Sequence, residues 1–215
     1  MPVVVRAPIG GGTGAGPFHS QNVEAWFTHV AGLKVVAPAT PSDAKGLLTA
    51  AFEAGNPVLY LEHKLLYRSA RERVAEGWYT VPLGRARVAR EGTEATIVTY
   101  SVGVPWALEA AERLAAEGKQ VEVVDLRTLL PWDRETVLAS ARKTGRVLVL
   151  HEAPTTGGFG AELAATIGRE AFEWLDAPVS RLGALDMPVP FSKALEEVFS
   201  PRGRLLPALR ELLAY

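Results

Sequence analysis

A glycine-rich stretch that directly follows an apolar run constrains the fold of this chain more than any other feature. Three valines occupy residues 3–5, five glycines fall within residues 10–16, and the polar triplet His19, Ser20 and Gln21 comes next. An apolar run ended by glycines is typical of a buried strand that leaves its sheet. Because glycine costs backbone entropy, this density indicates that the backbone approaches another group closely. We therefore expect the triplet at the carboxyl edge of a sheet, where open α/β sheets bind ligands.

Strand and helix patterns alternate through residues 1–62. Apolar runs predict three strands, at residues 3–5, 33–37 and 57–61, and a short helix is expected at 21–29. Thr40, Pro41 and Asp43 form a typical helix start, with Thr40 as the cap. The helix that follows carries an apolar stripe made of Ala44, Leu47, Leu48 and Ala51. Strands joined by helices through short connections predict a parallel sheet.

Residues 63–93 change character, and a second α/β unit is predicted over residues 94–215. We interpret 63–93 as a polar linker that could hold a hairpin near Trp78–Val88, with its arginines on a solvated surface. The second unit has expected strands at 95–101, 120–126, 146–150 and 179–182, the last of them at the sheet edge. Its helices are expected at 104–118, 133–143, 159–172 and around 205–213.

The first unit has only three predicted strands and begins inside its sheet. Parallel strands are normally covered and flanked, so an open start leaves a strand edge exposed. We expect that the first unit is a fragment or that a partner chain completes it.

The composition excludes several classes of function. With 23 basic and 24 acidic residues the net charge is -1, which leaves no footprint for nucleic acid and no polybasic membrane surface. Cysteine is absent, so disulfides, thiolate catalysis and cysteine metal sites are ruled out. No apolar run reaches the length of a membrane span and no secretory pattern opens the chain. We therefore expect a cytoplasmic protein.

The glycine loop also fits a dinucleotide-binding fingerprint, although weakly. Gly10, Gly12 and Ala15 have the required spacing after a strand. An acidic residue should then end the second strand, but residues 37–40 are Ala-Pro-Ala-Thr. No Gly-Lys-Ser/Thr follows either, which excludes a Walker loop. A nicotinamide site is therefore the less favoured interpretation.

The four histidines show no metal-binding spacing. His19 could exchange a proton near neutral pH, or it could be a hydrogen-bonded structural residue. We interpret His29 as structural and His63 as a surface residue at the start of the linker. His151 and Glu152 end a predicted strand, so they are either functional groups or part of a capped loop.

Ordered motifs run along the whole chain: Val3-Val-Val-Arg-Ala-Pro8, Gly16-Pro-Phe-His-Ser-Gln21, Gly32-Leu-Lys-Val-Val36, Pro41-Ser-Asp-Ala-Lys-Gly-Leu-Leu48, Asp125-Leu-Arg-Thr-Leu-Leu-Pro-Trp132, His151-Glu-Ala-Pro154 and Asp186-Met-Pro-Val-Pro190. Through these motifs the chain resembles the beta subunit of the thiamine-dependent decarboxylase component of 2-oxo acid dehydrogenase complexes. That family comprises the pyruvate, branched-chain 2-oxo acid and acetoin enzymes. The resemblance implies a partial thiamine-pyrimidine-type parallel-sheet domain followed by a transketolase C-terminal-like α/β domain.

The resemblance also implies partners and a cofactor. The family component is a heterotetramer of two alpha and two beta chains, with thiamine diphosphate between them. The diphosphate and magnesium would lie on the alpha subunit and the aminopyrimidine on this chain. A 2-oxo acid is decarboxylated, and its acyl group passes to the lipoyl domain of the acyltransferase component. The cofactor performs the carbon chemistry, while the protein orients the reactants and manages protons.

Particular residues match family positions. His19 matches the histidine beside the cofactor, where an imidazolium could protonate the thiolate left by the opened lipoyl disulfide. Gly16, Ser20 and Gln21 are expected to bind the cofactor, and the last two would shape the pocket rather than react. Asp176 and the terminal carboxylate of Tyr215 match the surface that binds the basic subunit-binding domain of the acyltransferase component.

A potassium site is the weakest of the implied features. Some relatives hold the ion mostly with backbone carbonyls, at the positions of Val3, Ala51, Phe52, Ala54 and Asn56. Ala54 stands where those relatives have an aspartate, and losing a carboxylate weakens a site for a hard cation.

The chain departs most from the family at its start. Family beta chains carry about another half-domain before Val3, including the glutamate that promotes the reactive cofactor tautomer. No residue here takes that role, so we expect the isolated chain to be inactive. The alternatives are a non-catalytic assembly or docking module derived from the subunit, and a relative of transketolase. Activity with a cognate alpha chain would separate the first of these from the enzyme.

Overall fold

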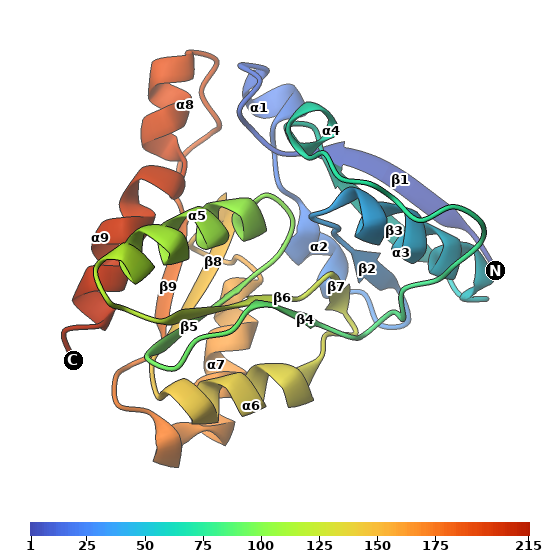
Figure 1. The fold of residues 1–215 in the computed structure, drawn as a ribbon. Coiled ribbons are helices and arrows are strands. Elements are labelled where there is room, and N and C mark those ends of the chain that lie inside the picture. Colours follow the sequence, from blue (N-terminus) through green and yellow to red (C-terminus); the bar gives the residue numbers. More distant parts are fainter.

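Two α/β units, each built on its own sheet, lie against each other in the computed structural model, which describes residues 1–215 (Figure 1). The first unit contains β1 (Val4–Ile9), α1 (Gly16–His19), α2 (Glu24–Thr28), β2 (Lys34–Val36), α3 (Pro41–Glu53), β3 (Val58–His63) and α4 (Leu66–Ser69). The rest of the chain contains β4 (Arg87–Arg90), β5 (Ala95–Thr99), α5 (Gly103–Ala116), β6 (Val121–Asp125), β7 (Thr128–Leu130), α6 (Arg134–Thr144), β8 (Val147–Pro154), α7 (Gly160–Glu170), the short 3-10 helix η1 (Phe172–Trp174), β9 (Ser180–Ala184), α8 (Lys193–Phe199) and α9 (Arg202–Leu212). The predicted alternation of strands and helices is confirmed.

The first sheet has four strands in the order β1-β3-β2-β7. β1 and β2 are both parallel to the central strand β3, with Val5 and Val35 opposite Leu59, so the predicted parallel pairing is confirmed. β7 lies antiparallel to β2 although it follows β6 along the chain. The sequence pattern predicts no strand at this position. β7 thus ties the later part of the chain into the first sheet.

α3 begins as predicted. The Thr40 hydroxyl accepts a hydrogen bond from the Asp43 amide at 3.2 Å, and Pro41 lies in the first turn, where its missing N–H costs nothing. The helix packs its apolar stripe on one face of the first sheet, in a cluster of Val36, Leu47, Ala51, Val58 and Tyr60.

The second sheet has five strands in the order β4-β6-β5-β8-β9. α5 and α9 cover one face, and α6 and α7 cover the other (Figure 1). β9 is the edge strand, as predicted. The hairpin expected near Trp78–Val88 is wrong, because residues 70–86 contain no strand and β4 pairs antiparallel with β6, Val88 opposite Val124. The open edge of β6 offers the N–H and C=O partners that a local hairpin would have supplied.

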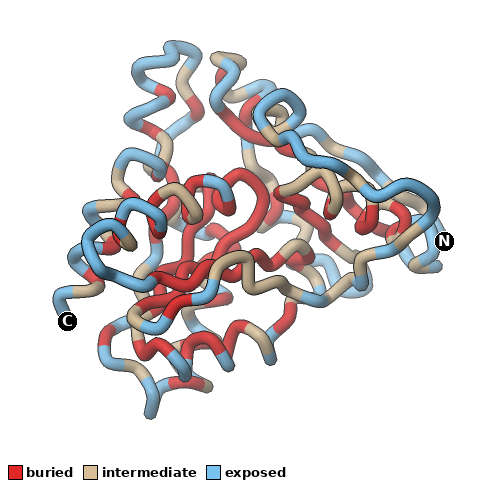
Figure 2. Tube along the Cα trace, viewed as in Figure 1, coloured by how far each residue is buried: buried red, intermediate tan, exposed pale blue.

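The two units share one hydrophobic core. A single cluster of 19 buried residues joins Ile9 and Leu59 of the first sheet to Val98 and Val124 of the second. Figure 2 shows buried segments on the strands of both units. Packed interiors deform little, so this shared core fixes how the loops at the two sheet edges face each other. The predicted boundaries at residues 62 and 93 remain a prediction.

Candidate functional site

The polar triplet lies at the end of α1. His19 is the last residue of this helix and is exposed, and Lys64 donates to its backbone carbonyl oxygen. Ser20 is 1% exposed, and its hydroxyl has no hydrogen-bond partner. Gln21 is exposed and donates from Nε2 to the carbonyl oxygen of Pro17 at 2.6 Å. The His19 imidazole is therefore accessible at the surface. Its orientation depends on the conformation of the backbone on either side of His19.

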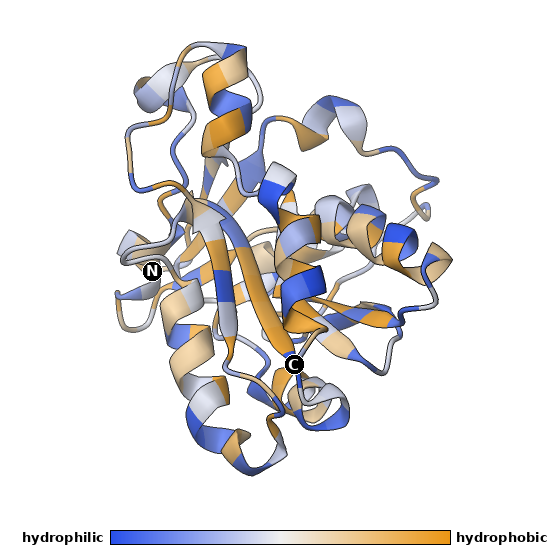
Figure 3. Cartoon of the chain, turned by 90° about the vertical axis from the view of Figure 1, so that its left-hand side faces the viewer, coloured by the Kyte–Doolittle hydropathy of each residue, from blue (hydrophilic) through white to orange (hydrophobic).

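Gly16 starts α1 and has a positive φ of 61°. A Cβ at this position would collide with the ring of Phe191, which precedes α8. The same ring lies 6.3 Å from that of Phe18, centroid to centroid. α8 itself presents Leu195 and Val198 to solvent, and Figure 3 shows its hydrophobic turns. The absence of a side chain at Gly16 thus lets the segment before α8 pack on the α1 segment.

Two glutamates from the later part of the chain hold the glycine loop. Glu196 of α8 accepts hydrogen bonds from the Gly12 amide at 2.8 Å and the Gly14 amide at 3.0 Å. Glu152 of β8 accepts one from the Gly11 amide at 3.3 Å. Backbone amides of glycine loops often bind anions such as phosphates. Here the protein's own carboxylates use these amides, which argues against the dinucleotide interpretation of the loop.

Glu152 is the centre of a buried polar network. Besides the Gly11 amide, its Oε2 atom accepts from Asn22 Nδ2 at 2.8 Å and contacts His63 Nε2 at 2.6 Å. The Leu65 amide donates to His63 Nδ1 at 3.2 Å, so Nε2 carries the proton and donates to Glu152. Burial alone would raise the pKa of Glu152, but the interactions with His63, Asn22 and Gly11 outweigh it and lower that pKa. Glu152 is thus an anion held by three donors.

The expectation that His63 lies on the surface is wrong. His63 is only 2% exposed. β3 continues past its predicted end at residue 61 and places the His63 ring between the two units. Gly10 provides that space, since a Cβ there would collide with the His63 ring. His29 is exposed at the end of α2, so burial does not support a structural role for its ring.

His151 and Glu152 lie inside β8 rather than after a strand, because β8 extends to residue 154. The His151 ring packs against Gly158, Gly160 and Gly183, where no side chain competes for space. Burial lowers the pKa of His151 to about 4, which keeps the imidazole neutral near pH 7. Of the two candidates, only Glu152 contacts the loop that carries His19.

A buried tyrosine–glutamate pair lies beside this network. The Tyr100 hydroxyl donates to Glu24 Oε1 at 2.6 Å, and Glu24 is 1% exposed. Burial raises the pKa of Glu24, and the negative charge of Glu152 adds to that effect, although the bond from Tyr100 opposes it. The pKa values of the two carboxyl groups are therefore shifted in opposite directions, a property that is common at functional sites.

Two cavities border the loop. One of about 380 Å³ lies beside α1 and α2 and is lined in part by Pro17, Gln21, Asn22, Trp26 and Glu152. The other, of about 560 Å³, lies between the glycine loop, α5, α8 and α9. Glu152 lines both, so the site found by the structure is larger than the triplet predicted from the sequence.

The five residues matched to a potassium site lie near the start of β1 and the end of α3. The Val3 carbonyl already accepts from the Val58 amide at 2.9 Å, and the Ala51 carbonyl from the Ala54 amide at 3.3 Å. Phe52 and Asn56 are exposed. No group of three or more histidine or acidic side chains gathers anywhere in residues 1–215 to hold a metal ion. The potassium site remains a prediction.

Asp176 follows η1, and Tyr215 follows α9. Asp176 pairs with Arg146, Oδ2 to Nη1 at 3.1 Å, and is largely exposed. Tyr215 is 66% exposed and lines a small cavity beside β9. Both are accessible to a partner, and their role as a binding surface remains a prediction.

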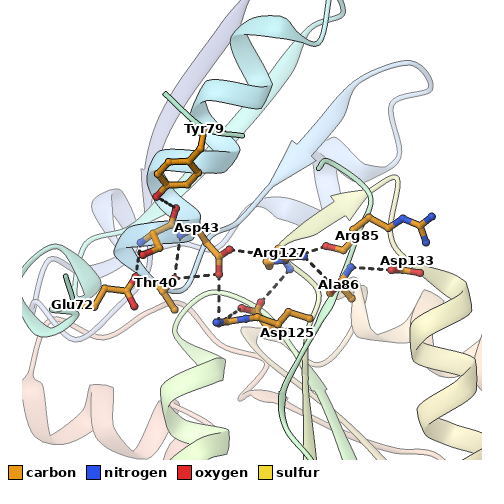
Figure 4. Close-up of polar contacts among 11 residues, drawn as sticks. Thr40, Asp43, Glu72, Tyr79, Arg85, Ala86, Asp125, Arg127 and Asp133 are labelled. Carbon is orange, nitrogen blue, oxygen red and sulfur yellow. Dashed lines mark hydrogen bonds and ion pairs between the residues drawn. The ribbon is translucent and has the colours of Figure 1, made fainter. Parts of the chain in front are cut away.

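A second, partly buried polar cluster joins the units (Figure 4). Arg127, which has a positive φ of 59°, donates to Asp43 Oδ1 at 3.1 Å and to two backbone carbonyl oxygens before β4. Arg87 Nη2 lies 3.4 Å from both Asp43 and Asp125. Burial, partly opposed by Arg87, raises the pKa of Asp125 to about 7. Local sequence patterns gave no signal for this cluster, because its members come from separate parts of the chain.

None of the helices combines the length and apolarity that crossing a bilayer requires.

Known proteins are similar to this chain in both sequence and fold. The family model described as "Transketolase, C-terminal domain" matches residues 84–204, and "Transketolase, pyrimidine binding domain" matches residues 1–70. The 2-oxoisovalerate dehydrogenase subunit beta 2 of Arabidopsis thaliana is 46% identical over 99% of this chain and 59% of its own length. The 2-oxoisovalerate dehydrogenase subunit beta of Bacillus subtilis is 44% identical over 100% of this chain and 66% of its own length. A pyruvate dehydrogenase E1 component subunit beta of Staphylococcus aureus is 44% identical over 93% of this chain and 61% of its own length.

Solved structures agree. A split gene transketolase, described as an inactive beta4 tetramer, superposes with a TM-score of 0.77 at 28% identity, over 98% of this chain and 65% of its own. A transketolase from Pichia stipitis superposes with a TM-score of 0.66 at 17% identity, over 100% of this chain and 30% of its own, which supports the fold alone. The chain therefore spans about two thirds or less of the length of these curated relatives, 59 to 66%.

Proposed function

The chain belongs to the transketolase C-terminal domain family, and from that premise we propose that it forms the beta-subunit side of a thiamine diphosphate site in a 2-oxo acid dehydrogenase. Its reaction would be the oxidative decarboxylation of a 2-oxo acid, with transfer of the acyl group to a lipoyl group. The observation that carries this proposal is the 44 to 46% identity to dehydrogenase beta subunits along nearly the whole chain.

The residues present fit one part of the cofactor. An exposed imidazole at His19 and a cavity bordered by Gln21 and Asn22 suit a polar heterocycle such as the aminopyrimidine. They do not suit the diphosphate, because the loop amides already bind Glu152 and Glu196, and two carboxylates repel an anion. This supports a division in which the alpha subunit holds the diphosphate and magnesium. When bound, thiamine diphosphate supplies the carbanion that attacks the 2-oxo carbon.

His19 would manage a proton in the transfer step. An imidazolium can donate a proton to the thiolate that forms when a lipoyl disulfide opens. Gln21 is held by its bond to the Pro17 carbonyl and would shape the pocket, and the buried Ser20 would do the same from behind.

The partners that fit this proposal are an alpha subunit, a second beta copy, and the lipoyl and subunit-binding domains of the acyltransferase component. Asp176 and Tyr215 would contact the subunit-binding domain, for which their exposure and negative charge are suitable. A potassium ion near Ala54 belongs to the same proposal.

A chimera tests the function directly. The matched region of the Bacillus subtilis beta subunit is replaced by this chain, and the product is mixed with that organism's alpha subunit. Decarboxylation is followed by the 2-oxo acid-dependent reduction of an artificial electron acceptor, with the parental beta subunit as control. We expect activity within about ten-fold of the parent, which corresponds to an increase in activation free energy of at most about 1.4 kcal/mol. A chimera that assembles with the alpha subunit but does not decarboxylate would contradict the proposal and favour a docking module.

A further inference from the structure

One oxygen atom of Glu152 ties both ends of the segment that carries His19. Oε2 accepts from the Gly11 amide at 3.3 Å, before His19, and from Asn22 Nδ2 at 2.8 Å, after it. Glu152 belongs to β8, far from both in sequence, and is 8% exposed. A buried carboxylate that accepts several hydrogen bonds is a strong anchor, because bonds to a charged acceptor are stronger than neutral ones.

Apart from the bond that Lys64 donates to the His19 carbonyl oxygen and the packing of Phe191 on Gly16 and Phe18, few contacts hold this segment. α1 has only four residues, and so short a helix is not stable by itself. Its helix start has no side-chain cap. Glu196 adds bonds to the Gly12 and Gly14 amides, again from outside the segment. The position of the His19 ring consequently depends on contacts from outside the segment, and the two carboxylates among them come from β8 and α8.

We propose that Glu152, assisted by Glu196, is a positioning residue that places the His19 imidazole for the proton transfer described above. The proposal rests on the proposed function. Glu152 would not touch the reacting atoms. It would act through the backbone of residues 11–22, while His63 holds the same oxygen from the end of β3.

The test compares conservative variants. Glu152→Gln keeps the size of the side chain and one acceptor oxygen but removes the charge. Asn22→Ala removes only the hydrogen bond from Asn22 to Glu152 and leaves the bond from the Gly11 amide. Glu122→Gln is the matched control, because Glu122 is also a buried glutamate but pairs with Lys143, away from the loop. Asn22→Ala keeps the test valid if Glu152→Gln does not fold.

Two readouts separate positioning from general stability. In the full 215-residue chain, amide exchange by NMR at Gly11 should accelerate about ten-fold or more in Glu152→Gln, relative to the exchange of core amides. In the chimera with its alpha subunit, kcat for acyl transfer to lipoamide should fall about ten- to hundred-fold while KM for the 2-oxo acid is unchanged. Glu122→Gln should change neither quantity.

The outcomes are distinct. Faster loop exchange together with a lower kcat supports the proposal. Unchanged exchange at Gly11, or faster exchange with an unchanged kcat, overturns it. If the unmodified chimera is inactive, the proposed function fails, and the NMR signals of the His19 ring then decide the positioning. Signals that shift in Glu152→Gln but not in Glu122→Gln support it, and signals that stay in place overturn it.

Discussion

At the scale of single residues, Asp125 gives the clearest pH dependence. Burial raises its pKa from 3.8 to about 7. Between these values the folded chain holds a proton that the unfolded chain has released, so stability falls as the pH rises through this window. The slope from this group is at most about 1.4 kcal/mol per pH unit.

Asp125→Asn removes this titration. We expect the free energy of unfolding of the variant, relative to the wild type, to improve steadily from pH 5 to pH 7 and then to level off. Urea unfolding at four pH values measures it. Asp186→Asn is the control. Hydrogen bonds from Thr156 lower the pKa of Asp186, so this carboxylate does not titrate between pH 5 and pH 7. A constant difference between Asp125→Asn and wild type would show that Asp125 titrates normally.

Residue-level prediction from the sequence was uneven for physical reasons. The polar triplet at His19 could be located, because an apolar run followed by glycines is a local pattern. Glu196 could not be found, since it meets Gly12 across 184 positions of sequence and nothing near either residue marks the contact. His63 was placed wrongly because its environment is set by the fold around β3 rather than by its neighbours in sequence.

At the scale of elements, the turn after β1 is specified by backbone conformation and by space together. Gly10 has a φ of 90°, and a side chain there would meet the buried His63 ring. Gly32 has a similar φ of 85° but open space around it. The two glycines therefore separate conformational strain from steric conflict.

We predict that Gly32→Ala costs about 1 kcal/mol of stability, from strain alone. Gly10→Ala should cost about 3 kcal/mol or more, because overpacking adds to the strain and the ring must leave Glu152. Denaturant unfolding gives both values, and the NMR shifts of His63 report the displaced ring. Equal losses for the two variants would mean that the His63 ring has room to move.

Element-level prediction followed periodicity closely. The start of α3 was correct because capping is local chemistry, carried by Thr40 and Pro41. β7 was missed because it has three residues and is defined by its antiparallel partner β2. The expected hairpin failed for the same reason, since β4 finds its partner in β6.

At the scale of the whole molecule, the Arg127 cluster and the shared core hold the units together. Arg127 is 12% exposed and bonds to Asp43 on α3, whereas Arg134 pairs with Glu170 at the surface with 55% exposure. We predict that Arg127→Met lowers the free energy of unfolding by about 3 kcal/mol. Arg134→Met should lower it by about 1 kcal/mol or less. Urea unfolding of both variants measures these losses. A similar small loss of stability in both would show that the Arg127 cluster does not stabilise the packing of the two units.

The fold class was predictable, but the arrangement that forms the site was not. Alternating patterns gave two parallel-sheet units, whereas the contact of β8 and α8 with the glycine loop depends on how the units pack. The first unit thus carries the His19 imidazole on a segment that Glu152 and Glu196 of the second unit hold in place.

The rate of lipoamide acylation by the chimera, with His19 or with His19→Ala, tests this account most directly. We predict that the His19→Ala chimera still decarboxylates the 2-oxo acid, while acyl transfer falls about a hundred-fold or more, as expected for the loss of a general acid. Transfer at the unmodified rate in His19→Ala would contradict the account.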